Sequence, residues 1–138
     1  MATWDDVARL ALGLPETAES TSYGNTAWKV KGKAFVWERP LGKSDLKALG
    51  DDAPPDGPIL GAYVDDLGEK EAVLAADTDA LFTIPHFDGY PAVLVLLDRV
   101  APARLEEIVL DAWLARAPKR LAQEYLANGT GPEHRADR

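Results

Sequence analysis

The sequence contains no cysteine. This absence excludes disulfides, thiolate catalysis, iron–sulfur clusters and zinc sites with cysteine ligands. Histidine is also scarce: there are two, and His134 lies in the polar C-terminal stretch, which leaves His86 within the expected fold. Because a zinc site needs about three or four protein ligands, we expect neither a transition metal nor a cofactor.

Long apolar runs are missing too. No run approaches the roughly 18 residues of a membrane-spanning helix, and the acidic start MATWDDVARLALGLPET lacks the basic region of a signal peptide. We therefore expect a cytoplasmic protein that does not contact a membrane. A chain of 138 residues with 46% hydrophobic residues suits one domain with a sizeable core. We expect residues 1–127 to form that domain and 128–138 to be a flexible tail.

Recognisable catalytic motifs are absent as well. Three serines, at positions 20, 22 and 44, stand outside any nucleophile elbow, and no glycine pattern matches a phosphate-binding loop. His86 beside Asp88 could act as a general base or contact a ligand, although such a histidine is more often a turn residue held by backbone bonds. We expect no catalytic residue and no enzymatic activity.

Positive charge is in deficit, with a formal net charge of −8, which argues against a general nucleic-acid binder. The charges are nevertheless segregated. From Trp28 to Lys47 there are six basic and two acidic residues. From Asp51 to Asp79 there are nine acidic residues and one basic residue, Lys70. The acids at 65, 66, 69 and 71 lack the spacing of a calcium loop and suit the start of a helix, so we expect no metal there.

The stretch YGNTAWKVKGKAFVWER, from Tyr23 to Arg39, predicts a β-hairpin, because two runs of β-forming residues flank a turn centred on Gly32. Side chains alternate along a strand. A two-residue turn would therefore place one apolar set on a common face, which needs helices to cover it: Trp28, Val30, Phe35 and Trp37. Three lysines would occupy the opposite face and the tip: Lys29, Lys31 and Lys33.

The remaining elements follow from periodicity and from breaking residues. We expect helices at 4–13, capped by Thr3, and at 43–49, 67–76 and 102–116, with a last one that begins at Pro118, buries Leu121, Tyr125 and Leu126 and stops at Asn128-Gly129. We expect strands at 16–22, 59–64 and 92–97, an extended segment at 78–85, and loops at 51–58 and 86–91. The expected fold class is α+β: a two-layer sandwich with an antiparallel sheet backed by the N- and C-terminal helices.

Five segments in this order resemble the MmcQ/YjbR family of small bacterial proteins: LALGLPET at 10–17, YGNTAWKVKGKAFVWE at 23–38, GAYVDDLGEKEAVLAA at 61–76, IPHFDGYPAVLVLLD at 84–98 and VLDAWLARAPKRL at 109–121. The resemblance covers roughly residues 4–125. It implies a fold similar to the CyaY/frataxin sandwich, a proposed DNA-binding activity and no known enzymatic chemistry.

Two functional hypotheses follow. In the first, the chain binds DNA weakly through basic residues on and near the hairpin: Lys29, Lys31, Lys33, Arg39, Lys43, Lys119 and Arg120. In the alternative, the chain is a non-enzymatic module that binds a small ligand or a protein through the His86–Tyr90 loop and nearby aromatic residues: His86, Tyr90, Trp28 and Trp37. In both cases we expect a monomer.

Overall fold

The computed structural model describes residues 2–22, 24–54 and 56–127. Its strands are β1 (Thr17–Ser22), β2 (Asn25–Val30), β3 (Lys33–Glu38), β4 (Ile59–Tyr63), β5 (Leu81–Phe82) and β6 (Ala92–Leu96). Its α-helices are α1 (Trp4–Leu12), α2 (Lys43–Leu49), α3 (Leu67–Ala76), α4 (Pro102–Arg116) and α5 (Lys119–Ala127). Two short 3-10 helices, η1 (Gly50–Asp52) and η2 (Pro85–Phe87), lie in the connections.

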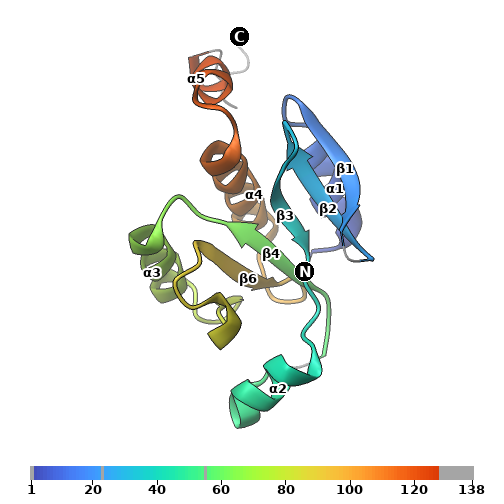
Figure 1. The fold of residues 1–138 in the computed structure, drawn as a ribbon, viewed down its shortest axis with the longest axis vertical. Coiled ribbons are helices and arrows are strands. Elements are labelled where there is room, and N and C mark those ends of the chain that lie inside the picture. Colours follow the sequence, from blue (N-terminus) through green and yellow to red (C-terminus); the bar gives the residue numbers. More distant parts are fainter. Residues whose placement is uncertain (1, 23, 55, 128–138) are drawn as a thin grey trace.

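The six strands form one antiparallel sheet in the order β1-β2-β3-β4-β6-β5. Helices α1 and α4 pack together on one face, behind the sheet in Figure 1. The main core lies between this helix layer and the sheet and includes Phe35, Leu60 and Trp113. The α+β class and the backing of the sheet by the N- and C-terminal helices are therefore confirmed.

The opposite face of the sheet, which we call the open face, carries a second and smaller core. Ile59, Ile84 and Phe87 are buried there, and Trp37 packs against them. The residues of η2 and the segment around α2 contribute to this core. The open face is the side toward the reader in Figure 1.

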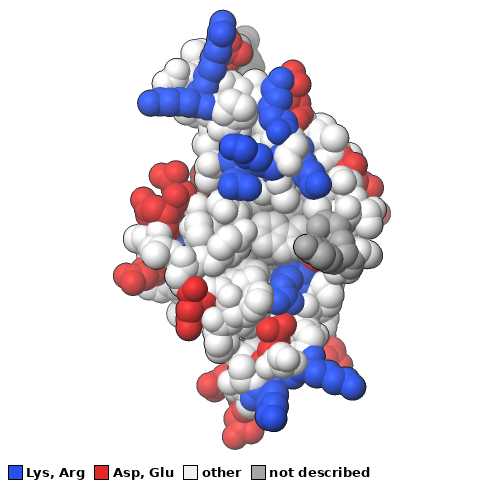
Figure 2. All heavy atoms as spheres, in the orientation of Figure 1, with Lys and Arg blue, Asp and Glu red and all other residues white. Residues whose placement is uncertain are grey.

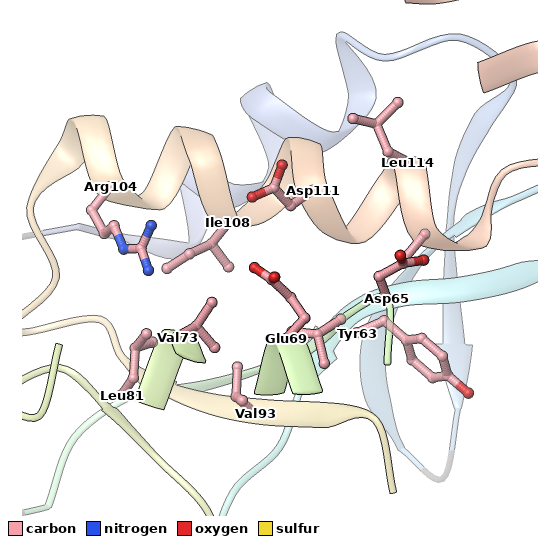
Figure 3. Close-up of a pocket in the computed structure, with 12 residues that line it drawn as sticks. Tyr63, Asp65, Glu69, Val73, Leu81, Val93, Arg104, Ile108, Asp111 and Leu114 are labelled. Atoms are coloured by element: carbon pink, nitrogen blue, oxygen red, sulfur yellow. The ribbon is translucent and has the colours of Figure 1, made fainter. Parts of the chain in front are cut away.

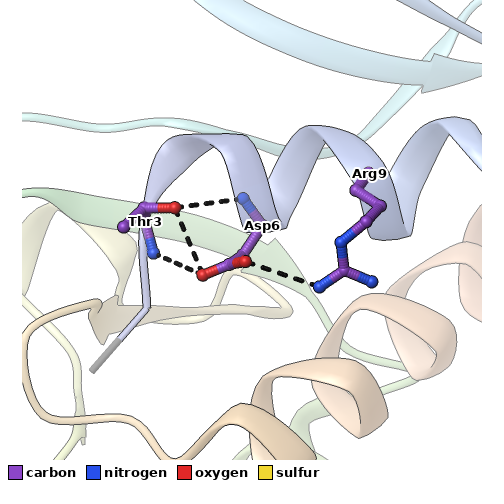
Figure 4. Close-up of polar contacts among 3 residues, drawn as sticks. All are labelled: Thr3, Asp6 and Arg9. Atoms are coloured by element: carbon purple, nitrogen blue, oxygen red, sulfur yellow. Dashed lines mark hydrogen bonds and ion pairs between the residues drawn. The ribbon is translucent and has the colours of Figure 1, made fainter.

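Helix α1 begins as its sequence predicts. The Thr3 hydroxyl accepts a hydrogen bond from the Asp6 backbone N–H at 3.2 Å, and the Asp6 carboxylate accepts one from the Thr3 backbone N–H at 3.0 Å (Figure 4). This reciprocal capping box satisfies two backbone donors that have no partner within the helix. Arg9 lies one turn further on, 3.4 Å from the same carboxylate.

The hairpin is present, but its predicted face is wrong for Trp37. Trp28 pairs with Val36 and Lys29 with Ala34, so Phe35 is an extra residue in β3, a β-bulge. A bulge shifts the alternation of side chains by one position. Trp28 packs in the main core as predicted and stacks on Trp4, with ring centres 6.4 Å apart. Trp37 lies on the open face instead.

Most other predicted elements agree with the structure within one or two residues. The segment 78–85 differs, because only Leu81 and Phe82 form a strand. Leu126 was expected to be buried with Leu121 and Tyr125, yet it is 61% exposed. The predicted helix stop at Asn128-Gly129 and the tail at 128–138 lie outside the described residues. Across the described ranges, no helix combines the length and the apolar character needed to span a membrane.

The contact between Trp37 and Gly61 provides a test of the open face. The two residues are paired between β3 and β4, and a Cβ on Gly61 would lie 2.5 Å from the indole ring. We expect Gly61→Ala to lower the free energy of unfolding by about 1–3 kcal/mol, because the indole would have to move. Urea unfolding measures this.

Gly68→Ala is the matched control for that substitution. The nearest atom to its added Cβ would be Asp66 Oδ1 at 3.4 Å, and alanine favours a helix over glycine. We expect no loss of stability for this control. An unchanged unfolding midpoint in Gly61→Ala would mean that the indole is not held against β4.

Candidate functional site

A pocket of about 640 Å³ opens on the open face of the sheet. This volume lies within the range of roughly 300–1,000 Å³ that is usual for small-molecule sites. Its walls come from the start of β2, from β3 and the residues after it, from the η2 loop and from the end of α4: Asn25, Thr26, Ala27, Ala34, Trp37, Glu38, Arg39, Pro40, His86, Phe87, Tyr90 and Arg116. We call it the Trp37 pocket.

Aromatic side chains form a connected wall beside this pocket. Trp37 lies 6.4 Å from Tyr63 between ring centres, and Tyr63 lies 5.5 Å from Tyr90 in an edge-to-face arrangement. Tyr90 in turn contacts Phe87, also edge-to-face at 5.5 Å. These geometries are favourable for aromatic pairs. Because Tyr90 is still 40% exposed, part of this wall is available to a ligand.

Arg116 reaches the pocket from α4, which lies on the other side of the sheet. Strands β3 and β4 pair only from Val36 to Glu38, so the backbone at Ala34 has no partner strand on that side. The Arg116 Nε donates a hydrogen bond to the Ala34 carbonyl at 3.2 Å. Its guanidinium lies 4.0 Å from the centre of the Tyr63 ring, a favourable cation–π distance.

Arg39, at the other end of β3, already forms hydrogen bonds within the protein. Its guanidinium donates to Asp45 at 3.1 Å and to the Pro40 carbonyl at 2.6 Å, and it lies 5.5 Å from the Phe87 ring centre. Burial opposes ionisation of Asp45, but the Gly42 backbone N–H and Arg39 outweigh it and hold the pKa of that carboxyl below its ordinary value. Arg39 is therefore largely neutralised within the protein.

The His86–Tyr90 loop is held in place by Lys70, a residue that the sequence analysis did not single out. Lys70 projects from α3, is buried, and donates from Nζ to the carbonyls of Phe87 at 2.6 Å and Tyr90 at 2.8 Å. Burial lowers its pKa, and Asp88 partly opposes this. Its position as the lone base among nine acids was the available signal, but lysine on a helix usually indicates a solvated surface.

The structure brings most of the ligand candidates together. His86, Tyr90 and Trp37 all line the Trp37 pocket, whereas Trp28 is only 2% exposed and lies in the core on the opposite face. Trp28 donates from its indole N–H to Glu19 at 3.1 Å. It is thus a core residue that cannot contact a ligand in the pocket.

The basic candidates for DNA contact fall into two groups. Lys29, Lys31 and Lys33 surround the β2–β3 turn, and this turn lies at the same end of the molecule as α5 with Lys119 and Arg120 (Figure 1). Arg39 and Lys43 lie toward the α2 end, beyond the far end of β3. Figure 2 shows Lys and Arg side chains at both ends of this face, with Asp and Glu mainly along its margins.

A second pocket of about 370 Å³ lies between α3 and α4. Glu69 and Asp111 point toward each other across it (Figure 3). Burial raises the pKa of Asp111, and the nearby Glu69 and Glu107 raise it further, while Arg104 opposes them. Over residues 2–127 without positions 23 and 55, no three His, Cys, Asp or Glu side chains are arranged to hold a metal ion.

Comparisons with known proteins identify relatives of the whole fold. A family model described as YjbR matches residues 12–115. Uncharacterized proteins from Mycobacterium tuberculosis (Rv2570) and Mycobacterium bovis (Mb2600) are each 52% identical over 130 residues, which cover 93% of this chain and 98% of theirs.

A solved structure is also similar. The crystal structure of Deinococcus radiodurans protein DR2400, described with the domain DUF419, aligns with a TM-score of 0.66 at 20% identity and covers 95% of this chain and 96% of that chain. At this identity the likeness concerns the fold alone. The expected similarity to CyaY and frataxin stays a prediction.

The phenol of Tyr90 gives the site a testable pH dependence. Burial, followed by the neighbouring Tyr63 hydroxyl, raises its pKa from 10.0 to about 12, although Arg116 opposes this. Because the folded-state pKa lies above the unfolded value, the stability contributed by the protonated phenol is present below pH 10 and is lost as the pH rises toward 12. We expect the wild type to lose free energy of unfolding across that window relative to Tyr90→Phe, in urea titrations at stepped pH. Identical pH dependence in the two proteins would contradict the raised pKa.

Proposed function

The chain belongs to the YjbR family, and from its Trp37 pocket we propose that it is a binding protein for a small molecule rather than an enzyme. The observation that carries this proposal is the aromatic wall of Trp37, Tyr63 and Tyr90 beside a pocket of about 640 Å³. Apolar and aromatic walls with a few polar groups are typical of small-molecule sites.

The fixed geometry of the wall supports binding. The indole of Trp37 rests against β4 at Gly61, where a single added carbon would collide with it. The loop that carries His86 and Tyr90 is held by two hydrogen bonds from the buried Lys70. A site that is already ordered avoids much of the entropic cost of binding.

In this proposal His86 contacts the ligand and does not act as a base. A nucleophile needs a base within hydrogen-bond reach. Within the described ranges, no side-chain hydrogen bond joins His86 to a hydroxyl or a carboxylate. His86 itself is exposed at the mouth of the pocket, where it can contact a ligand. The monomeric state and the cytoplasmic location stay predictions.

A substitution that fills the pocket tests the proposal. Ala34 lines the pocket, and Ala34→Leu should abolish fragment binding there because its larger side chain occupies the space. The measurement is a fragment screen by two-dimensional ¹H–¹⁵N NMR, with shifts expected at the Trp37 indole, His86 and Tyr90.

Ala18→Leu is the matched control for the filled pocket. Ala18 and Ala34 both pair with Lys29, from opposite sides of β2, but Ala18 does not line the pocket. We expect it to bind the same fragments as the wild type. Fragments that shift none of these pocket resonances, or that bind Ala34→Leu as well as the wild type, would refute the site.

Weak DNA binding through the basic residues is a second candidate. It is favoured by the position of the β2–β3 turn at the same end as α5, which brings Lys31 and Lys33 to the end of the molecule that holds Lys119 and Arg120 (Figure 1). Against it, Lys31 lies 3.5 Å from Glu16 and Arg120 lies 3.5 Å from Glu124. Exposed pairs of this kind are weak, so a phosphate can compete for both cations.

A salt titration tests the DNA candidate. About five phosphate contacts would lower the affinity for duplex DNA by roughly 500-fold between about 50 and about 200 mM salt. Changing Lys29, Lys31 and Lys33 together to Glu should abolish the binding of labelled duplex. The paired change Arg9→Glu and Lys47→Glu, at exposed positions outside the proposed set of contacts, is the control and should bind like the wild type. Absence of binding at the lower salt concentration would eliminate this candidate.

A further inference from the structure

Resting on the proposed Trp37 pocket, we infer that its ligand is an aromatic anion: a planar ring that packs beside Trp37 and Tyr90, with a carboxylate or phosphate group received by Arg116. This inference names the chemical class of the ligand, which the pocket volume alone does not. It depends on the state of Arg116, on the other charges around the pocket and on the geometry of the aromatic wall.

Arg116 differs from every other arginine in the described part of the chain. Each of the others has a carboxylate within 3.5 Å: Arg9, Arg39, Arg99, Arg104 and Arg120. Arg116 has no ion pair with any described residue, and among these residues only its Nε donates a hydrogen bond. A guanidinium has five N–H donors, so both of its terminal nitrogens remain available to an anion at the pocket wall.

The guanidinium of Arg116 is also held in a defined orientation. The bond from Nε to the Ala34 carbonyl fixes one edge of the group, and the Tyr63 ring at 4.0 Å supports its face. A planar guanidinium binds carboxylate and phosphate groups through two parallel hydrogen bonds. Because the group is already oriented, binding an anion costs little additional side-chain entropy.

The other charged groups of the pocket do not satisfy Arg116. Glu38 is the acidic residue of the lining, and its Oε1 accepts the Thr26 backbone N–H at 2.8 Å. Asp45 is paired with Arg39. Because Arg39 is neutralised by Asp45 and Glu38 already accepts a backbone N–H, Arg116 is the group of the lining that can favour a negatively charged ligand over a cation of similar shape.

The aromatic wall offers a surface for the planar ring of the ligand. Trp37 is half-buried and Tyr90 is 40% exposed, so each has surface left for a planar ring. A tyrosine phenol is protonated near neutral pH, and burial raises the pKa of Tyr90 further, to about 12. The hydroxyl can therefore donate a hydrogen bond to an anion instead of repelling it.

The test compares ligand pairs that differ in the anionic group. Indole-3-carboxylate against indole examines the carboxylate, AMP against adenosine examines the phosphate, and inorganic phosphate alone examines the anion without a ring. Affinities come from calorimetry, and the binding position from NMR shifts at Trp37 and Tyr90. We expect the anionic member of at least one pair to bind at least about 10-fold more tightly than its neutral partner, as a charge-assisted bond would give.

Substitution of Arg116 assigns that preference to one side chain. Arg116→Gln should reduce the preference for the anion to about 1-fold, Arg116→Lys should retain part of it, and Arg9→Gln, which changes an exposed arginine on α1, should leave it intact. The pair that responds distinguishes a carboxylate ligand from a phosphate ligand. Because the two members of a pair are compared on the same protein, a change in stability cannot mimic this result.

Different negative results distinguish an error in the anion inference from an error in the proposed pocket. If neutral and anionic members bind the wild-type pocket equally, and Ala34→Leu abolishes both, the pocket stands and the anion inference is wrong. An equal preference in wild type and Arg116→Gln also overturns it. If no ring compound, charged or neutral, perturbs Trp37 or Tyr90, both the inference and the proposed pocket fail.

Discussion

One extra residue in strand β3 determines how the two faces of the sheet are used. Because Phe35 has no partner in β2, the alternation of side chains shifts between Trp28 and Trp37. Trp28 joins the core under α1 and α4, while Trp37 emerges on the open face and lies on β4 at Gly61. Without this bulge, both indoles would compete for the same core and the pocket would lose its main wall.

Two positively charged side chains then complete the open face through contacts that the strands alone do not provide. Arg116 bonds to the Ala34 carbonyl where β3 extends beyond its pairing with β4. Lys70 supplies the carbonyls of Phe87 and Tyr90 with a donor. Both serve as structural donors, which explains why basic residues lie within and beside an aromatic site in a protein with a net charge of −8.

The distribution of charge bears on both proposed activities. Arg116, which forms no ion pair with a described residue, lines a pocket that is large enough for a small molecule. The basic surface at the β2–β3 turn is smaller than the count of basic residues in and near the hairpin suggests. Arg39 does not belong to it, because it is paired with Asp45 and lies toward the other end of the sheet. Membership of the YjbR family is compatible with either use of the open face.

The sequence by itself determined the elements whose signals are local. Thr3 and Asp6 begin α1 through bonds across three residues, and the helix predicted at 67–76 matches α3 at both ends. The loop predicted at 86–91 likewise lies between β5 and β6, because Asp88-Gly89 favours a turn. In each case the deciding groups are a few positions apart, so their interactions form whatever the rest of the chain does.

Only the tertiary structure decided which side Trp37 takes, because a bulge depends on how three neighbouring strands pack and not on the alternation within one of them. It likewise decided the partners of Lys70, 17 and 20 residues away, and of Arg116, 82 residues away. No local pattern encodes such bonds. They form because folding brings these two side chains within reach of carbonyls in the η2 loop and at Ala34 of β3.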